Sequence, residues 1–346
     1  MADELVNISG LQTEAVKYEP VLKTLPFDTL ETGLAPLGIN VIDVTEKNII
    51  QSFERKGGLI RPYTAGDPDD DINVGEIGKV KERELDVKKC VLALREHIDN
   101  YKGMKIVGIN TNSDNQSKKN PMERIILEAV VNTISEDILD AVFHMKRDTA
   151  DLSPMGCADG FNELINNDIA AGDIVTGKGN YKATGAIILP ANSSDTDAID
   201  KVVDFVRSAH PQLRKRGILM LDPTTLYYVL KAMENKVQSH QVIDFETMLK
   251  YMRTVTICPT LQIATADCLG TGGRLIYSKP GNFDFGMRTG SDKGFVQVRN
   301  PYKDPNWVQY WSQFEIGCRV REIHAKEFMV NDQVNTAIEL AGDYRS

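Results

Sequence analysis

The chain has 346 residues, 42% of them hydrophobic and 26% charged, and its 40 basic and 49 acidic side chains give a net charge of −9. This composition is typical of a globular protein with a sizeable core and excludes a disordered or collagen-like polymer. No apolar run approaches the ~20 residues of a membrane helix, and the acidic start Met1–Leu5 has no apolar signal-peptide core. We expect a soluble cytoplasmic protein of about two domains, with no membrane partner.

The first quarter of the chain differs from the rest in charge and pattern. Residues 1–86 hold seventeen acidic and nine basic side chains, whereas the remainder is nearly neutral. Three prolines and two glycines interrupt residues 11–40, which predicts an extended arm rather than a helix. Its acidic charge excludes a DNA-binding tail. Apolar side chains favour an arm ordered on another subunit over the alternative, a flexible terminus: Val21, Leu22, Leu25, Phe27 and Leu30.

The next segment predicts a long hairpin. Residues 57–63 and 72–85 are typical of two strands, and Gly66–Asp71 is a turn-forming cluster between them. Since neither flank has a continuous apolar face, we expect the hairpin to project and to pair its charges with a neighbouring subunit. An ordinary surface excursion is the alternative.

A long helix is predicted over residues 120–147. Asn120 is suited to cap it, Pro121 to occupy its first position and Glu123 its first turn. Apolar residues then recur at helical spacing and predict a buried stripe: Leu127, Val130, Val131, Ile134, Ile138, Ala141, Val142 and Met145. His144, near its end, is expected at the surface or as a cap.

The rest of the chain has a mixed pattern. Apolar runs predict short strands over 185–190, 217–221, 255–257, 261–265 and 274–278. Helices are expected from Ser194 and over 226–234, the latter capped by Asp222. Residues 307–320 predict a long half-buried strand with one apolar face: Val308, Tyr310, Phe314, Ile316, Cys318 and Val320.

No pattern of residues indicates an enzyme. Gly172–Gly179 nearly matches a phosphate-binding P-loop, but it lacks the final hydroxyl and a following helix, so we expect a turn. Gly270–Gly273 precedes a strand and also predicts a turn. The five histidines show no catalytic spacing, and the five cysteines, with no Cys-x-x-Cys pair, are expected as free thiols. We therefore predict no catalytic, cofactor-binding or metal-binding residues.

The order of these parts resembles the major capsid proteins of tailed bacteriophages, the Hong Kong 97-type shell fold. The segments that carry the likeness are Gly217–Tyr228, Ile276–Gly286, Pro301–Trp307 and Phe314–Val320. The resemblance implies an α+β protein with an N-terminal arm (1–56), an E-loop hairpin (57–88), a P domain (89–150 and 300–346, with the spine helix at 120–147) and a mixed α/β A domain (151–299).

By the same resemblance, the chain is expected to assemble with itself into pentamers and hexamers of an icosahedral head that encloses double-stranded DNA without sequence-specific binding. Portal and scaffold or decoration proteins are the other implied partners, and the implied location is the virion, assembled in the bacterial cytoplasm. Some members cross-link Lys to Asn, for which Lys79 or Lys81 would be the hairpin candidates, although no motif supports this. The alternatives are an encapsulin-like compartment and a soluble α/β nucleotide-binding enzyme.

Overall fold

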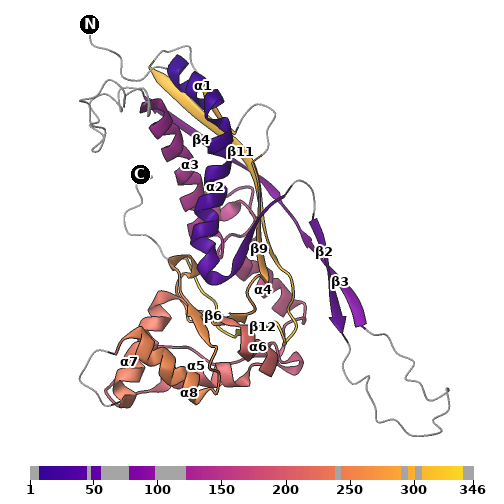
Figure 1. Cartoon of the computed structure of the whole chain (residues 1–346), viewed down its shortest axis with the longest axis vertical. Coiled ribbons are helices and arrows are strands. Elements are labelled where there is room, and N and C mark those ends of the chain that lie inside the picture. The colour runs from indigo at the N-terminus through magenta and orange to yellow at the C-terminus, as the bar shows by residue number, and fades with distance from the viewer. Residues whose placement is uncertain are drawn as a thin grey trace, which may run out of the picture.

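The computed structural model describes residues 8–44, 48–55, 78–97, 122–237, 243–289, 295–300 and 306–337. Figure 1 shows an elongated upper lobe, a lower lobe rich in helices, and a two-stranded hairpin that leaves the body. Two clusters of buried apolar side chains form the core, the larger one running through the upper lobe and the smaller one lying among the lower helices.

One long strand, β11 (Trp307–Val320), organises the sheet of the upper lobe. The other strands of this sheet are β1 (Ile39–Asp43), β4 (Lys88–His97), β9 (Phe283–Arg288) and β10 (Val296–Arg299). Strands β4, β9 and β10 pair antiparallel with β11, and β1 pairs parallel with β9. The strand predicted over 307–320 is confirmed, and so is its apolar face, because every second side chain from Val308 to Val320 is buried.

Helix α3 (Met122–Ala141) carries the predicted apolar stripe, which is buried along its length. The helix is shorter than the predicted range 120–147. The helix ends at Ala141 because the carbonyl oxygens of the next residues, Val142 and Phe143, accept hydrogen bonds from the first backbone amides of α4 (Phe161–Ala170). Each helix end thereby satisfies free polar groups of the other.

Two further expectations concern the ends of α3. The predicted cap residues Asn120 and Pro121 lie outside the described residues. His144 is not at the surface as expected: it is half-buried, and burial lowers the pKa of its imidazole. A β-carbon on Gly270 would stand 2.6 Å from its Nε2.

The N-terminal segment is helical, and the prediction that residues 11–40 are extended is wrong. Helices α1 (Ile8–Lys17) and α2 (Glu19–Leu34) precede a short 3-10 turn, η1 (Ala35–Leu37). Pro20 lies in the first turn of α2, where a missing N–H is tolerated. Pro26 lies inside α2, but it shares a buried stripe at four-residue spacing with Leu22, Leu30 and Leu34, so burial outweighs the lost hydrogen bond.

The same helices dock on their own chain. Helix α2 packs against α3, and Gln12 of α1 donates a 3.1 Å hydrogen bond from Nε2 to the carbonyl oxygen of Val298 in β10. Leu11, Leu22 and Leu30 are fully or almost fully buried. The expectation that this segment is ordered only on another subunit is therefore wrong for residues 8–44.

The hairpin consists of β2 (Asn48–Arg55) and β3 (Gly78–Leu85), paired antiparallel from Asn48 opposite Leu85 to Arg55 opposite Gly78. Its second strand lies within the predicted flank 72–85. Its first strand precedes the predicted flank 57–63, which lies outside the described residues together with the turn at 66–71. Figure 1 shows β2 and β3 pointing away from both lobes.

The lower lobe has a mixed sheet with the strand order β5–β12–β8–β6–β7. The strands are β5 (Tyr181–Lys182), β6 (Ile218–Met220), β7 (Gln262–Ala264), β8 (Ile276–Ser278) and β12 (Phe328–Asn331). The helices are α5 (Asp197–Ser208), α6 (Pro211–Arg216), α7 (Pro223–Val237) and α8 (Phe245–Val255). Of the other described 3-10 turns, η5 (Thr176–Lys178) contacts β5, whereas η4 (Pro154–Gly156) and η6 (Asp267–Leu269) contact α3 of the upper lobe.

Most predicted elements of this lobe are confirmed, including both helices and the strands near 217–221, 261–265 and 274–278. Asp222 caps α7 as expected, since its Oδ1 accepts a 2.8 Å hydrogen bond from the amide of Thr225. The strand predicted over 185–190 is wrong: the segment is irregular, with Ile188 and Leu189 exposed. The strand over 255–257 is also wrong, because Val255 ends α8, whose apolar face is buried.

Candidate functional site at the base of the hairpin

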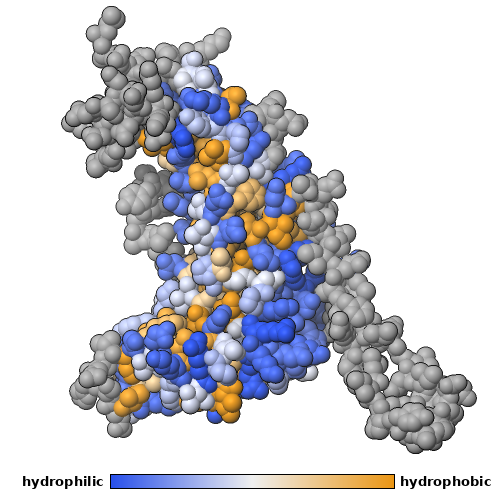
Figure 2. Space-filling view, viewed as in Figure 1, coloured by the Kyte–Doolittle hydropathy of each residue, from blue (hydrophilic) through white to orange (hydrophobic). Residues whose placement is uncertain are grey.

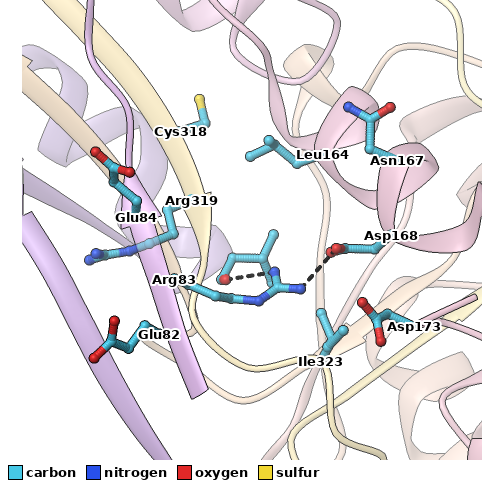
Figure 3. A pocket seen from close by; sticks show the side chains of 11 residues that line it. Glu82, Arg83, Glu84, Leu164, Asn167, Asp168, Asp173, Cys318, Arg319 and Ile323 are labelled. Atoms are coloured by element: carbon cyan, nitrogen blue, oxygen red, sulfur yellow. Dashed lines mark hydrogen bonds and ion pairs between the residues drawn. The ribbon is translucent and has the colours of Figure 1, made fainter. Parts of the chain in front are cut away.

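Arg83 connects the hairpin to the body through two hydrogen bonds. Arg83 of β3 donates a 2.8 Å hydrogen bond from Nη2 to Oδ1 of Asp168 in α4, and a 3.1 Å hydrogen bond from Nη1 to the carbonyl oxygen of Val320 at the end of β11 (Figure 3). Because the guanidinium is rigid and planar, the two bonds fix the direction of β3 relative to both elements. The site therefore sets where the hairpin leaves the body.

The surroundings of Arg83 are strongly charged. A cavity of about 500 Å³ opens beside it. Figure 3 shows side chains of both signs around the guanidinium, among them Glu82, Glu84, Asp173 and Arg319. Burial raises the pKa of Asp168 above its ordinary value, and the positive charge of Arg83 opposes this only in part. The Oδ2 atom of Asp168 makes no hydrogen bond within the described part of the chain.

A buried charge cluster lies in the sheet next to this cavity. Asp284 of β9 has no exposed side-chain surface and pairs with Arg319 of β11, whose side chain is 2% exposed. Arg321 donates to Oδ2 of Asp284 at 2.7 Å, and Asn40 of β1 donates to Oδ1 at 3.3 Å. The Asp284 carboxylate thus links strands β1, β9 and β11 through charge-assisted hydrogen bonds.

The P-loop-like segment forms a turn, as predicted. Its lysine bonds its own loop: the Nζ of Lys178 donates to the carbonyl oxygen of Gly172 at 2.9 Å and to Oδ1 of Asp173 at 3.1 Å. Gly179 adopts a left-handed conformation with φ 73° and ends η5, and strand β5 rather than a helix follows it. The Gly270–Gly273 segment precedes β8 as expected, but it is an irregular segment with a bend at Gly272 and an antiparallel bridge between Thr271 and Thr336.

Each of the five cysteines is a free thiol. Within the described ranges, no group of three or more His, Cys, Asp or Glu side chains is placed to hold a metal ion. Among the helices described, none combines the length and apolar character required to cross a bilayer.

The residues of this site were not predicted from the sequence. Arg83 lies in a run of alternating charges, where nothing distinguishes it from Lys79 or Lys81, whose side chains lie outside the described residues. Asp168 lies 85 positions away on a separate helix. Only the approach of β3 to α4 brings the two together.

Comparisons with known proteins agree on the fold. No protein-family model matches the chain, and the search of curated proteins gives no match. Among solved structures, the capsid of an empty GTA particle is 12% identical, with 88% of this chain and 96% of that chain covered and a TM-score of 0.54. A procapsid of satellite phage P4 with its size determination protein is 13% identical, with 89% of both chains covered and a TM-score of 0.55. The capsid of a native GTA particle is 14% identical, with 89% and 91% covered and a TM-score of 0.53.

The chain thus has the shell fold of phage capsid proteins, and the predicted resemblance to tailed-phage major capsid proteins is confirmed at the level of the fold. The α+β class is confirmed as well, since helices and mixed sheets make up both lobes. The encapsulin-like alternative is not favoured by these likenesses.

Proposed function

We propose that this chain is the major capsid protein of a tailed phage, and that its copies assemble as pentamers and hexamers into an icosahedral head around double-stranded DNA. The observation that carries the proposal is the likeness of nearly the whole chain to shell subunits, since the alignment covers 88% of this chain and 96% of the first of them. In this function the chain does no bond chemistry. Its task is association with further copies of itself.

The projecting hairpin is the structural support for assembly. A two-stranded hairpin is marginally stable in water unless it packs on something else. Arg83 joins β3 to the body near the Leu85 end of the strand pair, and we propose that the opposite end, where Arg55 pairs with Gly78, contacts a neighbouring copy. Many modest contacts of this kind act together once a shell closes.

The remaining assignments follow from the proposed function. We assign the arm to residues 1–56, the E-loop to 57–88, the P domain to 89–150 and 300–346, and the A domain to 151–299. The arm helices pack on the body of their own chain. Portal and scaffold or decoration proteins are the expected partners, and assembly takes place in the bacterial cytoplasm. An enzymatic role is not proposed, because the one phosphate-loop candidate, Lys178, is bonded to its own turn.

Deleting residues 66–77 tests the proposal, since it shortens the hairpin but keeps β2 and β3. The full chain is expected to give closed shells by electron microscopy. The deletion variant is expected to give soluble, folded subunits or small oligomers with an unchanged circular dichroism spectrum. Normal closed shells from the variant would overturn the role of the hairpin.

A further inference from the structure

A small basic pocket lies in the lower lobe, away from the hairpin base. Its volume is about 290 Å³, and its walls come from α6, from the turn after β8 and from the loop that precedes β12. Figure 2 shows a hydrophilic surface over the region where Figure 1 places α6. The lining side chains are Gln212, Leu213, Lys215, Arg216, Lys279, Lys326 and Glu327.

The charge of this pocket is opposite to that of the chain. Four cations meet one carboxylate, Glu327, whose Oε2 lies 3.1 Å from the Nζ of Lys279. The chain as a whole carries −9. At the edge of the pocket, the pKa of His210 is lowered by burial and by the positive charges of Lys326, His324 and Arg214.

The helix dipole does not account for this cluster. Basic residues in the last turn of a helix are stabilised by the dipole, which explains Lys215 and Arg216 at the end of α6. Lys279 and Lys326 come from other segments, and folding brings their charges to the same pocket against mutual repulsion. Lys215 and Arg216 are exposed, so their charges face solvent and are available to a ligand, whereas the exposed Lys279 is paired with Glu327.

The chemistry of the lining selects the kind of ligand. Lysine and arginine supply donors suited to phosphate oxygens, and Gln212 adds a neutral amide. The seven lining residues include no aromatic side chain on which a base could stack. We propose that this basic pocket contacts the phosphate backbone of double-stranded DNA without reading its bases.

The inference rests on the proposed function for the identity of the polyanion, because the shell would enclose double-stranded DNA. A rival ligand is an acidic peptide, and this chain contains one in the run Asp67–Asp71. DNA is favoured because its uniform charge can meet the same pocket on every copy, while the acidic remainder of each subunit repels it. Such a contact is weak per subunit and allows the genome to slide.

The salt dependence of binding gives the expected magnitude. Each phosphate neutralised contributes about −0.9 to the slope of log K against log salt concentration, and Lys279 already pairs with Glu327, so the three remaining cations predict a slope of about −2.7. Lys215→Ala is expected to reduce the slope by about one. Glu327→Gln removes the competing carboxylate and is expected to strengthen binding.

The test titrates the full chain, as unassembled subunits, with two short DNA duplexes of unrelated sequence, using fluorescence anisotropy at several salt concentrations. Lys250→Ala is the matched control, because it removes one exposed positive charge from α8, outside the pocket. The proposal predicts equal binding of both duplexes, a smaller slope for Lys215→Ala and tighter binding for Glu327→Gln, with Lys250→Ala like the parent chain.

Three results would overturn the proposal. The first is that the chain does not bind either duplex, and the second is that Lys215→Ala and Lys250→Ala change the salt slope of DNA binding equally. The third is that Lys215→Ala still binds DNA but no longer binds a peptide of residues 64–74. The Glu327→Gln variant keeps the test decisive if a lysine variant fails to fold. Closed shells without DNA binding would refute the pocket alone. Pocket-dependent DNA binding by a chain that never forms shells would refute the proposed function and leave the pocket in place.

Discussion

Arg83 and Asp168 are joined by a 2.8 Å hydrogen bond that links the hairpin to α4, and their side chains are only 24% and 18% exposed. In burial, the pair is intermediate between a surface ion pair, which contributes little to the free energy of unfolding, and a buried ion pair, whose disruption lowers that free energy strongly. It lies where the hairpin joins the body, and so a change in this pair should affect both folding and the direction of the hairpin.

Arg83→Met is expected to lower the free energy of unfolding by about 1–2 kcal/mol, because it removes two hydrogen bonds and leaves Asp168 without its partner. Urea unfolding of unassembled subunits measures this. Lys88→Met is the control, since it breaks the more exposed pair with Asp86 and should cost almost nothing. Equal losses in the two variants would contradict the role of Arg83.

The ionisation of Asp168 gives a prediction about pH. Because its pKa in the folded chain is raised above the ordinary value of 3.8, the folded state binds the proton more tightly than the unfolded state. The contribution of this carboxyl to stability is therefore greatest below pH 3.8 and falls as the pH rises through the higher folded pKa. The difference in unfolding free energy between the parent chain and Asp168→Asn should decrease over that window. An increase would show that Arg83 outweighs burial.

The cis docking of the N-terminal helices can be tested on isolated subunits. Leu30 is fully buried, so Leu30→Ala is expected to cost about 2–5 kcal/mol of unfolding free energy. Val21 lies on the same helix with 42% of its surface exposed, and Val21→Ala should cost far less. If the segment were ordered only by a neighbouring copy, Leu30→Ala would leave the isolated subunit unchanged.

The buried cluster around Asp284 should contribute more than any surface pair. Arg319→Met leaves Asp284 with a weaker set of partners in an interior position and is expected to cost about 3–5 kcal/mol. Arg288→Met serves as the control, because Arg288 is 45% exposed and lies 3.5 Å from Glu315. Thermal unfolding of both variants decides the point: similar melting temperatures would contradict a structural role for the cluster.

Periodicity in the sequence predicted the elements whose burial is regular. Alternation over residues 307–320 identified both β11 and its buried face, and the helical spacing from Leu127 to Ile138 identified α3. The ends of α3 were less predictable, because the turn after Ala141 depends on hydrogen bonds to α4, which is distant in sequence.

Local rules failed where tertiary contacts outweighed them. The prolines of residues 11–40 indicated an extended arm, yet the four-residue spacing from Leu22 to Leu34 was a helical pattern that α3 could bury. Strand β2 was not predicted, because it precedes the turn-forming residues by more than ten positions, and the predicted flank 57–63 lies outside the described residues. The Arg83–Asp168 pair had no signal at all, since it depends on where two elements meet.

Negative-stain electron microscopy of the purified full-length chain tests the central claim most directly. If the chain is a shell subunit, the micrographs will show closed particles of uniform diameter with pentameric and hexameric clusters. A chain that stays a monomer or a small defined oligomer at every concentration and salt condition, with no closed particles, would contradict the account.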